Sequence, residues 1–253
     1  MKVLALDSSG LVASVALTDG DVLVAEYTTD YKKTHSQTLL PMLDEIRRMV
    51  ELDLKTIDVI GVAAGPGSFT GLRIGSATAK GLGLALGVPL AAIPTMDALA
   101  CNLYGCEKLI CPMMDARREQ VYTGLYSFER QDGSLALQRI LPQCTMSAVE
   151  VIEKVNQLGR EVIFLGDGAA AYRTVIETRI CVPCSFAPAS CNRQRAASVA
   201  VLAAQYAAQG ELVEAAAFAP EYLRLSQAER SRMNASDEEQ ERMKAGVKPG
   251  GRT

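Results

Sequence analysis

The sequence predicts an α/β protein of two related lobes, and two observations lead to this prediction. Apolar runs of the length of buried strands alternate with segments whose apolar residues recur at helical spacing. The order of these segments then begins again near the middle of the 253-residue chain. A duplicated domain would leave such a repeat, and a chance similarity between two α/β patterns is the alternative.

The first half is predicted to fold as three strands, a helix, a strand, a second helix and a short strand. Asp19-Gly20 lies between the second and third apolar runs and is a strong hairpin signal. Apolar residues at helical spacing, with charged residues mostly opposite, predict the first helix. The elements expected here are strands over residues 2–7, 12–17, 22–27, 58–64 and 90–93, and helices over residues 36–50, after Gly71, and from Thr95 onward.

The second half repeats this order. A strand over residues 109–114 ends in Asp115, as the first strand of the chain ends in Asp7. A later strand over residues 162–165 runs into a second glycine-containing loop, Gly166-Asp167-Gly168. The other elements expected here are strands over residues 120–128 and 135–141 joined by Asp132-Gly133, a helix around residues 149–155, and an alanine-rich helix over residues 196–208.

These patterns predict three regions. Residues 1–105 are expected to form the first lobe, and residues 106–224 a smaller second lobe. Beyond Leu225 large apolar residues nearly vanish and Glu, Arg, Ser and Lys dominate. Residues 225–253 are therefore expected to be a polar tail, weakly helical or disordered.

Composition and charge exclude several classes of protein. The net charge of −3 does not indicate a nucleic-acid-binding surface. The start of the chain meets Asp7 at once, which argues against a signal peptide, and no apolar run reaches the ~20 residues of a membrane span. An odd number of cysteines, seven, favours reduced thiols in the cytoplasm. Cys181 and Cys184 have CxxC spacing with Cys191 nearby, where small buried thiols are favoured over a structural metal site.

The most distinctive stretch is the glycine-rich run from Gly65 to Gly75, between a predicted strand and a predicted helix. A glycine turn at a helix N-terminus is typical of a phosphate cradle. The run lacks the lysine of a P-loop and the spacing of a dinucleotide fingerprint. A tight turn that feeds a small-residue helix packed closely on something is therefore the favoured interpretation, and phosphate binding stays open.

Four motifs follow one another along the chain. They are Leu4-Ala5-Leu6-Asp7-Ser8-Ser9, His35-Ser36-Gln37 ahead of Leu39-Leu40-Pro41, the run GPGSFTGLRIG from Gly65 to Gly75, and Pro220-Glu221-Tyr222-Leu223-Arg224. The GPGSFTGLRIG run is highly specific. In this order the four motifs resemble those of the bacterial TsaB (YeaZ) family of tRNA threonylcarbamoyladenosine biosynthesis proteins.

This resemblance implies an actin-like, Hsp70-like ATPase fold (the ribonuclease H-like class) of two related α/β lobes. It implies a role in adding threonylcarbamoyl to the adenosine beside the anticodon of tRNA. In the family the chemistry resides in a paralogous subunit, TsaD, which holds a metal through a His-x-x-x-His pair, and a third subunit, TsaE, carries the ATPase activity. Because His35 is the only histidine of this chain, no catalytic residue, metal or cofactor is expected here. The chain is expected to bind and activate TsaD, to reach tRNA through the complex, and to form a homodimer when TsaD is absent.

The resemblance also implies which residues form sites. The two helices after His35 and after Gly71 would meet their counterparts on TsaD, with Leu43 and Ile74 expected to face outward and Arg73 to pair with an acidic group. The expected interface residues are Leu39, Met42, Leu43, Ile46, Leu72, Arg73 and Ile74. A vestigial nucleotide site is expected at Asp7, Ser8, Ser9, Gly65 and Gly67.

Two other functions remain open at this point. A small-molecule kinase or nucleotide-binding protein of the same fold would need catalytic carboxylates and a full second lobe. A peptidase would need several metal ligands or a thiol paired with His35. His35 is more readily interpreted as a partly exposed imidazole packed at the lobe surface.

Overall fold

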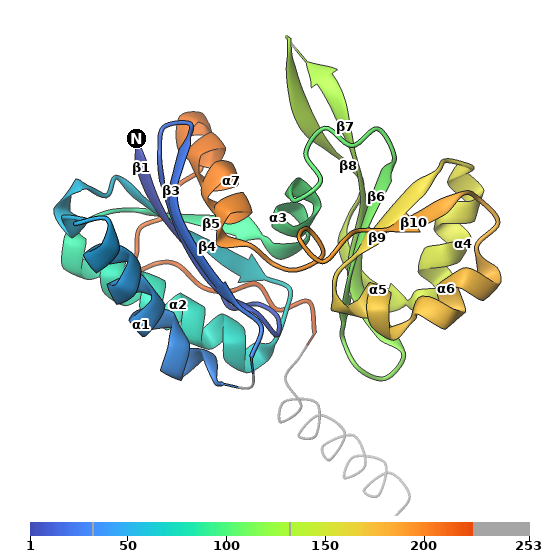
Figure 1. Cartoon of the computed structure of the whole chain (residues 1–253), viewed down its shortest axis with the longest axis horizontal. Helices are drawn as coiled ribbons and strands as arrows, with labels where there is room; N and C mark the ends of the chain where they lie inside the picture. The colour runs from blue at the N-terminus through green and yellow to red at the C-terminus, as the bar shows by residue number, and fades with distance from the viewer. Residues whose placement is uncertain (32, 132, 225–253) are drawn as a thin grey trace, which may run out of the picture.

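Each lobe is built on a five-stranded mixed sheet (Figure 1). The computed structural model describes residues 1–31, 33–131 and 133–224. The first sheet has the order β3-β2-β1-β4-β5 and the second the order β8-β7-β6-β9-β10. The first sheet comprises β1 (Lys2–Asp7), β2 (Ala13–Asp19), β3 (Val22–Thr29), β4 (Val59–Gly65) and β5 (Leu90–Pro94). The second comprises β6 (Leu109–Asp115), β7 (Gln120–Gln131), β8 (Ser134–Ser147), β9 (Val162–Leu165) and β10 (Cys184–Phe186).

The two sheets have the same topology. In the first, β1 pairs antiparallel with β2 and parallel with β4. In the second, β6 pairs antiparallel with β7 and parallel with β9. The fourth strand of each sheet leads to a glycine of positive φ, Gly65 at +123° and Gly166 at +96°. The predicted repeat is confirmed, and the fold is the actin-like arrangement of two related lobes.

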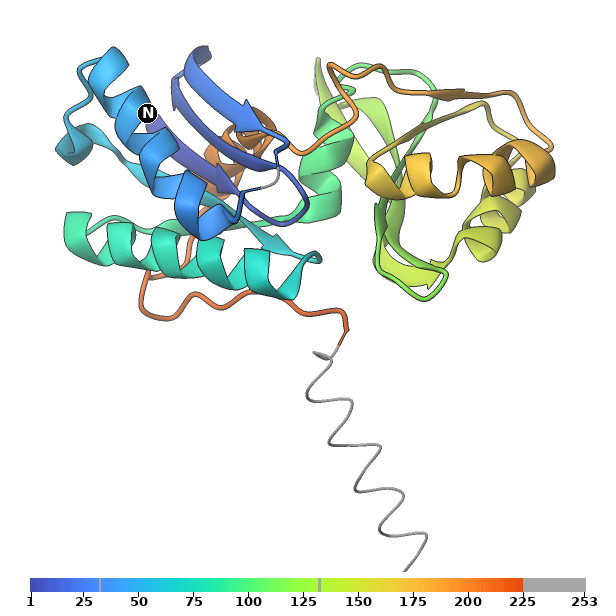
Figure 2. The same cartoon turned by 60° about the horizontal axis from the view of Figure 1, so that its bottom comes forward.

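Helices cover both faces of the first sheet. α1 (His35–Met49) and α2 (Phe69–Leu86) lie side by side on one face, and α7 (Ala196–Gln209) lies on the other (Figure 2). A short 3-10 helix, η1 (Leu54–Thr56), leads into β4. Alternate residues of β1 divide between the two cores, because Leu4 and Leu6 pack with α1 whereas Val3 and Ala5 pack with α7.

The position of α7 differs from the expected boundary at residue 106. This helix lies within residues 106–224 but packs on the first sheet, with Val199, Ala200 and Ala203 buried. The fit is close, because a Cβ at Gly61 of β4 would lie 2.8 Å from the Cβ of Ala203. Helical periodicity predicts which face of α7 is apolar, but it carries no information about which sheet that face covers.

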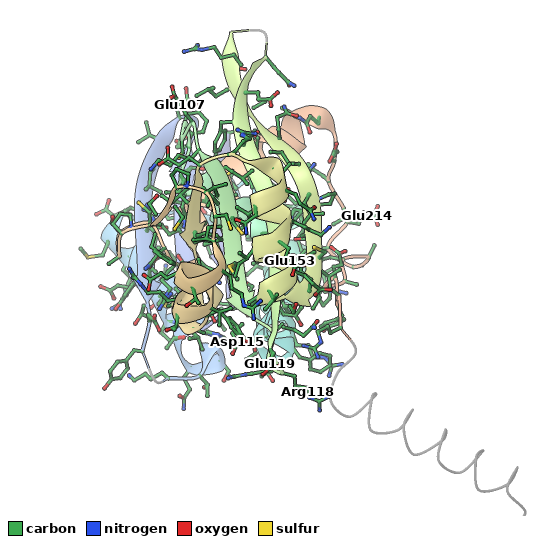
Figure 3. All side chains as sticks on the ribbon, turned by 90° about the vertical axis from the view of Figure 1, so that its right-hand side faces the viewer. Glu107, Asp115, Arg118, Glu119, Glu153 and Glu214 are labelled. Atoms are coloured by element: carbon green, nitrogen blue, oxygen red, sulfur yellow. The ribbon has the colours of Figure 1, made fainter. Side chains whose placement is uncertain are left out.

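The second lobe has helices on the outer face of its sheet. They are α4 (Ala148–Leu158), α5 (Asp167–Ala171) and α6 (Arg173–Arg179), of which only α4 was predicted. α4 begins with a capping box between Ser147 and Glu150 and turns polar residues such as Glu153 to solvent (Figure 3). The predicted tail, residues 225–253, lies outside the described residues. Among the helices that are described, none has the length and apolar character that a membrane crossing requires.

The inner face of the second sheet packs against the first lobe through α3 (Thr95–Cys101). Met96 and Leu99 of α3 share a buried cluster with Ile110 and Tyr126 of the second sheet. A polar contact reinforces this cluster. Asp97 of α3 is 1% exposed, and its Oδ2 accepts hydrogen bonds from Arg139 Nε at 2.7 Å and lies 2.5 Å from Arg139 Nη2. The two lobes are therefore joined by a common core and by an ion pair that is buried on the aspartate side.

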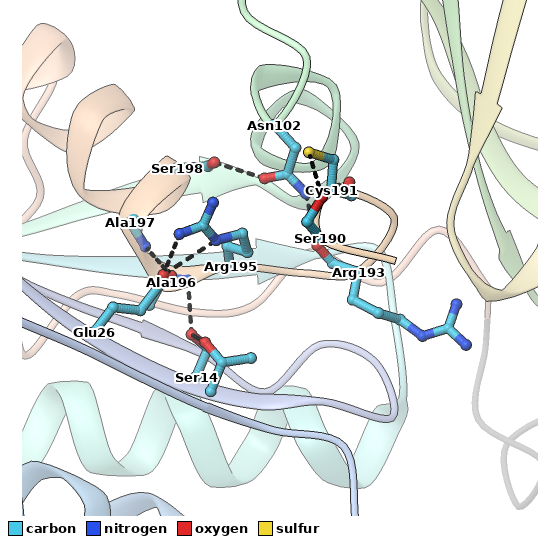
Figure 4. Close-up of polar contacts among 11 residues, drawn as sticks. Ser14, Glu26, Asn102, Ser190, Cys191, Arg193, Arg195, Ala196, Ala197 and Ser198 are labelled. Carbon is cyan, nitrogen blue, oxygen red and sulfur yellow. Dashed lines mark hydrogen bonds and ion pairs between the residues drawn. The ribbon is translucent and has the colours of Figure 1, made fainter. Parts of the chain in front are cut away.

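The segment that returns from the second lobe to α7 is also held by polar contacts (Figure 4). Asn102 Nδ2 donates to the carbonyl oxygens of Cys191 and Arg193 at 3.0 and 2.6 Å. Glu26 of β3 accepts from Arg195 and from the backbone N–H of Ala197. The crossing chain is thus tied to α3 on one side and to the first sheet on the other.

We expect Arg139→Ala to lower the free energy of unfolding by about 3 kcal/mol, because Asp97 would stay buried without its cation. The matched control is Arg48→Ala on α1, whose ion pairs with Asp44 and Glu45 are exposed. That control should change stability by less than about 1 kcal/mol. Urea unfolding of both variants measures the difference, and equal effects would show that the Asp97–Arg139 pair has no special weight.

Candidate functional site

A cavity of about 380 Å³ lies between the lobes. The turn after β1 and the N-terminus of α2 form its wall in the first lobe, and the β6–β7 turn forms the wall in the second. The chain just before residue 225 closes one side. The lining residues are Ser9, Gly10, Leu11, Gly67, Ser68, Phe69, Leu72, Met114, Asp115, Ala116, Arg117, Tyr122, Asp167, Glu221, Tyr222, Leu223 and Arg224.

In the turn after β1 the serine hydroxyls bond to other groups of this chain, whereas the buried Oδ2 of Asp7 has no hydrogen-bond partner among the described residues. Asp7 is 1% exposed, and its Oδ1 accepts from the backbone N–H and the hydroxyl of Ser9 at 2.9 and 2.7 Å. The hydroxyl of Ser8 donates to the carbonyl of Gly71 at 2.9 Å. Burial raises the pKa of Asp7 above its ordinary value, although the bonds from Ser9 oppose this shift. Both serine hydroxyls thus bond within the chain.

The glycines of α2 and of the turn before it lie against this loop. A Cβ at Gly67 would lie 2.2 Å from the carbonyl oxygen of Ser9, and one at Gly71 would lie 2.1 Å from that of Ser8. A Cβ at Gly75 would lie 2.4 Å from the hydroxyl oxygen of Ser8. Gly71 and Gly75 are four residues apart in α2 and therefore lie on one face of the helix, and Gly67 lies in the turn just before it. This confirms the prediction that the glycine-rich run leads into a closely packed helix. The element that packs on the helix is the turn after β1 of the same chain.

The charges of the cavity do not fit a nucleotide phosphate. Asp115, Asp167 and Glu221 place three carboxyl groups in its lining. Burial raises the pKa of Asp167. Arg117 forms an ion pair with Asp115 at 3.3 Å, and Arg224 donates to backbone carbonyls. Of the residues expected at a nucleotide site, Ser9 and Gly67 line this cavity, and Asp7, Ser8 and Gly65 are not among its lining residues.

The chain from Glu221 to Arg224 crosses the mouth of the cavity. Glu221 donates its backbone N–H to Ala64 at 2.7 Å, and a Cβ at Gly65 would lie 2.2 Å from its carbonyl oxygen. The ring of Tyr222 packs on Phe69 with 4.9 Å between centroids. Arg224 then reaches the second lobe, where Nη1 donates to the carbonyls of Ala116 and Arg117.

The β6–β7 turn that receives Arg224 has an uncommon backbone. Arg117, Arg118 and Glu119 follow one another with φ of 64°, 55° and 60°, each of which costs about 1 kcal/mol for a residue other than glycine. The turn lies at the edge of the second lobe, next to Asp115 (Figure 3). The Pro220–Arg224 motif is recognisable in the sequence, but its contacts could not be predicted because its partners lie more than a hundred residues away along the chain.

Most of the predicted interface residues are buried within this chain. The exposed fraction is 5% or less for Leu39, Met42, Leu43, Ile46 and Leu72. The prediction that Leu43 faces outward was therefore wrong, because α1 covers the sheet with that face. Ile74 is partly buried against the same core, and Arg73 is exposed with its guanidinium 4.1 Å from the ring centroid of Phe69. The large apolar side chains that α1 does expose are Leu40 at 53% and Met49 at 75%.

Comparison with known proteins relates this architecture to a family. The family model TsaD, described as tRNA N6-adenosine threonylcarbamoyltransferase, matches residues 23–232. The tRNA threonylcarbamoyladenosine biosynthesis protein TsaB of Bacillus subtilis is 32% identical over 229 residues, which cover 90% of this chain and 96% of that protein. This chain belongs to the TsaB family.

Other members support this assignment. TsaB of Haemophilus influenzae is 32% identical over 191 residues, covering 71% of this chain and 78% of that protein. Among solved structures, YeaZ from Pseudomonas aeruginosa has a TM-score of 0.70 and 28% sequence identity, with 88% of this chain and 99% of that chain covered. The similarity therefore extends over both lobes.

The single histidine of this TsaB-family chain has a structural contact. His35 Nε2 donates to the carbonyl of Gly10 at 2.9 Å, and Gly71 lies beside the ring. The imidazole thus ties the start of α1 to the turn after β1, in agreement with the packing interpretation. Cys181 is exposed, and Cys184 and Cys191 are partly buried as free thiols. Within the described residues, no three His, Cys, Asp or Glu side chains are grouped so that they could hold a metal ion.

We expect Gly71→Ala to destabilise the protein by about 3 kcal/mol or more, because the new methyl group would overlap the Ser8 carbonyl. Gly81→Ala is the matched control in the same helix, since a Cβ there meets nothing within 4 Å. That control should raise stability by about 0.5–1 kcal/mol through helix propensity. Urea unfolding of the two variants measures the expected decrease in stability for Gly71→Ala and the expected increase for Gly81→Ala. A neutral Gly71→Ala would contradict the close contact.

Proposed function

We propose that this chain is a non-catalytic, activating subunit of the assembly that adds threonylcarbamoyl to the adenosine beside the anticodon of tRNA. It binds the paralogous subunit TsaD directly and meets TsaE in the same assembly. It reaches tRNA through that complex, in the cytoplasm. The names of its relatives place them in tRNA threonylcarbamoyladenosine biosynthesis, which supports the pathway.

The chemistry of the cavity supports a role without catalysis. The hydroxyls of Ser8 and Ser9, in the turn after β1, donate to other groups of this chain. Of the two arginines in the lining, Arg117 forms an ion pair with Asp115, and Arg224 donates to backbone carbonyls. A kinase of this fold would need free donors for the transferred phosphate, because phosphoryl transfer depends on stabilisation of the charged oxygens. The chain also contains one histidine, so it cannot supply the His-x-x-x-His pair that the family's transferase subunit uses.

The observation that carries the proposal is the outer surface of α1 and α2. α1 fills its core positions and still exposes Leu40 and Met49, and α2 exposes Leu84 at 62%. Exposed apolar side chains on both of these neighbouring helices favour a protein partner. Arg73 stands on the same surface, where the Phe69 ring orients it toward an acidic group of that partner. A paralogue of the same fold would present an equivalent helix pair, which makes a pseudo-twofold contact possible.

We expect Leu40→Glu and Arg73→Glu each to weaken binding to the cognate TsaD by roughly a hundredfold. A carboxylate buried in the interface without a partner costs several kcal/mol. Both side chains are exposed in the free chain, so its fold should survive. Isothermal titration calorimetry against purified TsaD measures the change.

The control for that experiment is Leu158→Glu at the end of α4 in the second lobe, where the side chain is 40% exposed. Its affinity for TsaD should equal that of the unaltered chain. If Leu40→Glu and Arg73→Glu also bind TsaD with unchanged affinity, the surface of α1 and α2 is not the interface.

A further inference from the structure

A groove lies between the lobes on the side of the first sheet that α7 covers (Figure 1). Its volume is about 670 Å³, which is within the range of small-molecule sites. The β2–β3 turn and the outer side of α7 form its wall in the first lobe, and the β7–β8 hairpin forms the wall in the second. The large apolar residues that line this α7 groove include Leu23, Tyr104, Phe128, Leu135, Leu137 and Val201.

Several of these apolar side chains are open to solvent. Tyr104 is 64% exposed, Val201 is 50% exposed and Leu23 is 45% exposed. The ring of Tyr104 meets that of Phe128 edge-on, with 5.2 Å between their centroids. Single exposed apolar residues are ordinary on a protein surface, but here separate segments of the chain place them around one hollow. A ligand with an apolar body would remove them from water.

A β-bulge directs Leu23 into the groove. Leu17 pairs with Ala25 whereas Thr18 pairs with Leu23, so Val24 is the extra residue of β3. Side chains two residues apart on a regular strand share a face, and Ala25 packs against the core beneath α1. Without the bulge, Leu23 would point to that face as well. The bulge instead places Leu23 beside Thr18, and both line the α7 groove.

The β2–β3 end of the groove offers groups that accept hydrogen bonds. Thr18 is 6% exposed and Asp21 is exposed, and both line the groove. Within the described part of the chain, neither side chain forms a hydrogen bond or an ion pair. The other charged lining residue, Arg195, is bound to Glu26. The charge that stays free in the described lining is therefore negative.

We propose that the α7 groove binds a small amphipathic amine. Its apolar body packs between α7 and the β7–β8 hairpin and covers Leu23, Tyr104 and Val201. Its ammonium group lies at Asp21 and Thr18. An ammonium group carries three donors and a positive charge, which complement a carboxylate and a hydroxyl oxygen. An anionic ligand is disfavoured, because it would meet the carboxylate of Asp21.

The α7 groove is separate from the other surfaces of this chain that have been assigned a role. α7 covers one face of the first sheet, whereas α1 and α2 cover the other (Figure 2). The groove also shares no lining residue with the 380 Å³ cavity. The inference therefore does not rest on the proposed function, and either can fail alone.

The test is a ¹H–¹⁵N NMR titration of the full chain with 4-phenylbutylamine. Its analogues 4-phenylbutanol and 4-phenylbutyrate carry the same apolar body with a neutral and an anionic end. We expect the amine to bind with a Kd below about 1 mM. It should bind about tenfold more tightly than the carboxylate, because the two charged ends interact with Asp21 with opposite sign. The signals that shift should be those of residues 18–23 and 201–208.

Two variants separate the charge from the apolar body. Asp21→Asn should weaken binding of the amine about fivefold and leave binding of the alcohol unchanged, because only the ammonium group uses the carboxylate. Val201→Trp should weaken binding of all three probes, because the larger side chain fills the groove. Asp21 and Val201 are exposed, and thermal unfolding verifies that each variant is folded. The matched control, Glu153→Gln on the exposed side of α4, should leave every affinity unchanged.

Four outcomes would overturn the proposal. A Kd for the amine above about 1 mM, or shifts centred on Phe69 and Tyr222 of the other cavity, would show that the α7 groove is not its site. Equal affinities for the amine and the carboxylate would rule out recognition of the ammonium group. An Asp21→Asn variant that loses as much affinity for the alcohol as for the amine would rule it out as well.

Discussion

A close backbone contact recurs in both lobes, and the rest of the architecture depends on it. In each lobe the chain at the end of the first strand presses on a glycine that follows the fourth strand. A Cβ would lie 2.1 Å from the Ser8 carbonyl at Gly71, and 2.1 Å from the Met113 carbonyl at Gly166. No side chain fits at such a distance, so glycine is required for the first strand and the following helix to meet. In the first lobe the same contact lets the Ser8 hydroxyl donate to the carbonyl of Gly71 in the first turn of α2.

The packing of the α2 glycines against the turn after β1 affects what the site between the lobes can bind. The loop and helix that would hold phosphates in an enzyme of this fold instead bond to each other, through Ser8, Ser9 and Gly71. The chain from Glu221 to Arg224 crosses the cavity mouth and bonds to both lobes. Together with the ion pair between Asp97 and Arg139, these contacts connect the two lobes. These contacts between the lobes support the proposed role as a binding partner, because an enzyme of this kind closes its lobes on a substrate.

The sequence predicts the succession of the first four strands of each lobe along the chain, because each element has its own local pattern, and the strands that end in Asp7 and Asp115 begin the same series. It does not predict the short strand β10 or the helices α5 and α6. It also predicts a closely packed glycine helix, although not that the loop at Ser8 is what packs on it. Two features depend on contacts between distant segments and could not be predicted. The periodicity of α1 does not show whether an apolar residue such as Leu43 faces the core of its own lobe or a partner. In the structure Leu43 is buried in the core. The periodicity of α7 likewise does not show that Val199 and Ala203 cover the first sheet.

Reconstituted threonylcarbamoyl transfer tests the proposed role most directly. Purified TsaD, TsaE, the threonylcarbamoyl-adenylate donor and tRNA are combined with and without this chain, and the modified adenosine is measured by mass spectrometry. We expect transfer only when TsaD and this chain are both present, and none from this chain alone with donor and tRNA. Robust transfer by this chain in the absence of TsaD, or full transfer by TsaD and TsaE without it, would contradict a non-catalytic, activating subunit.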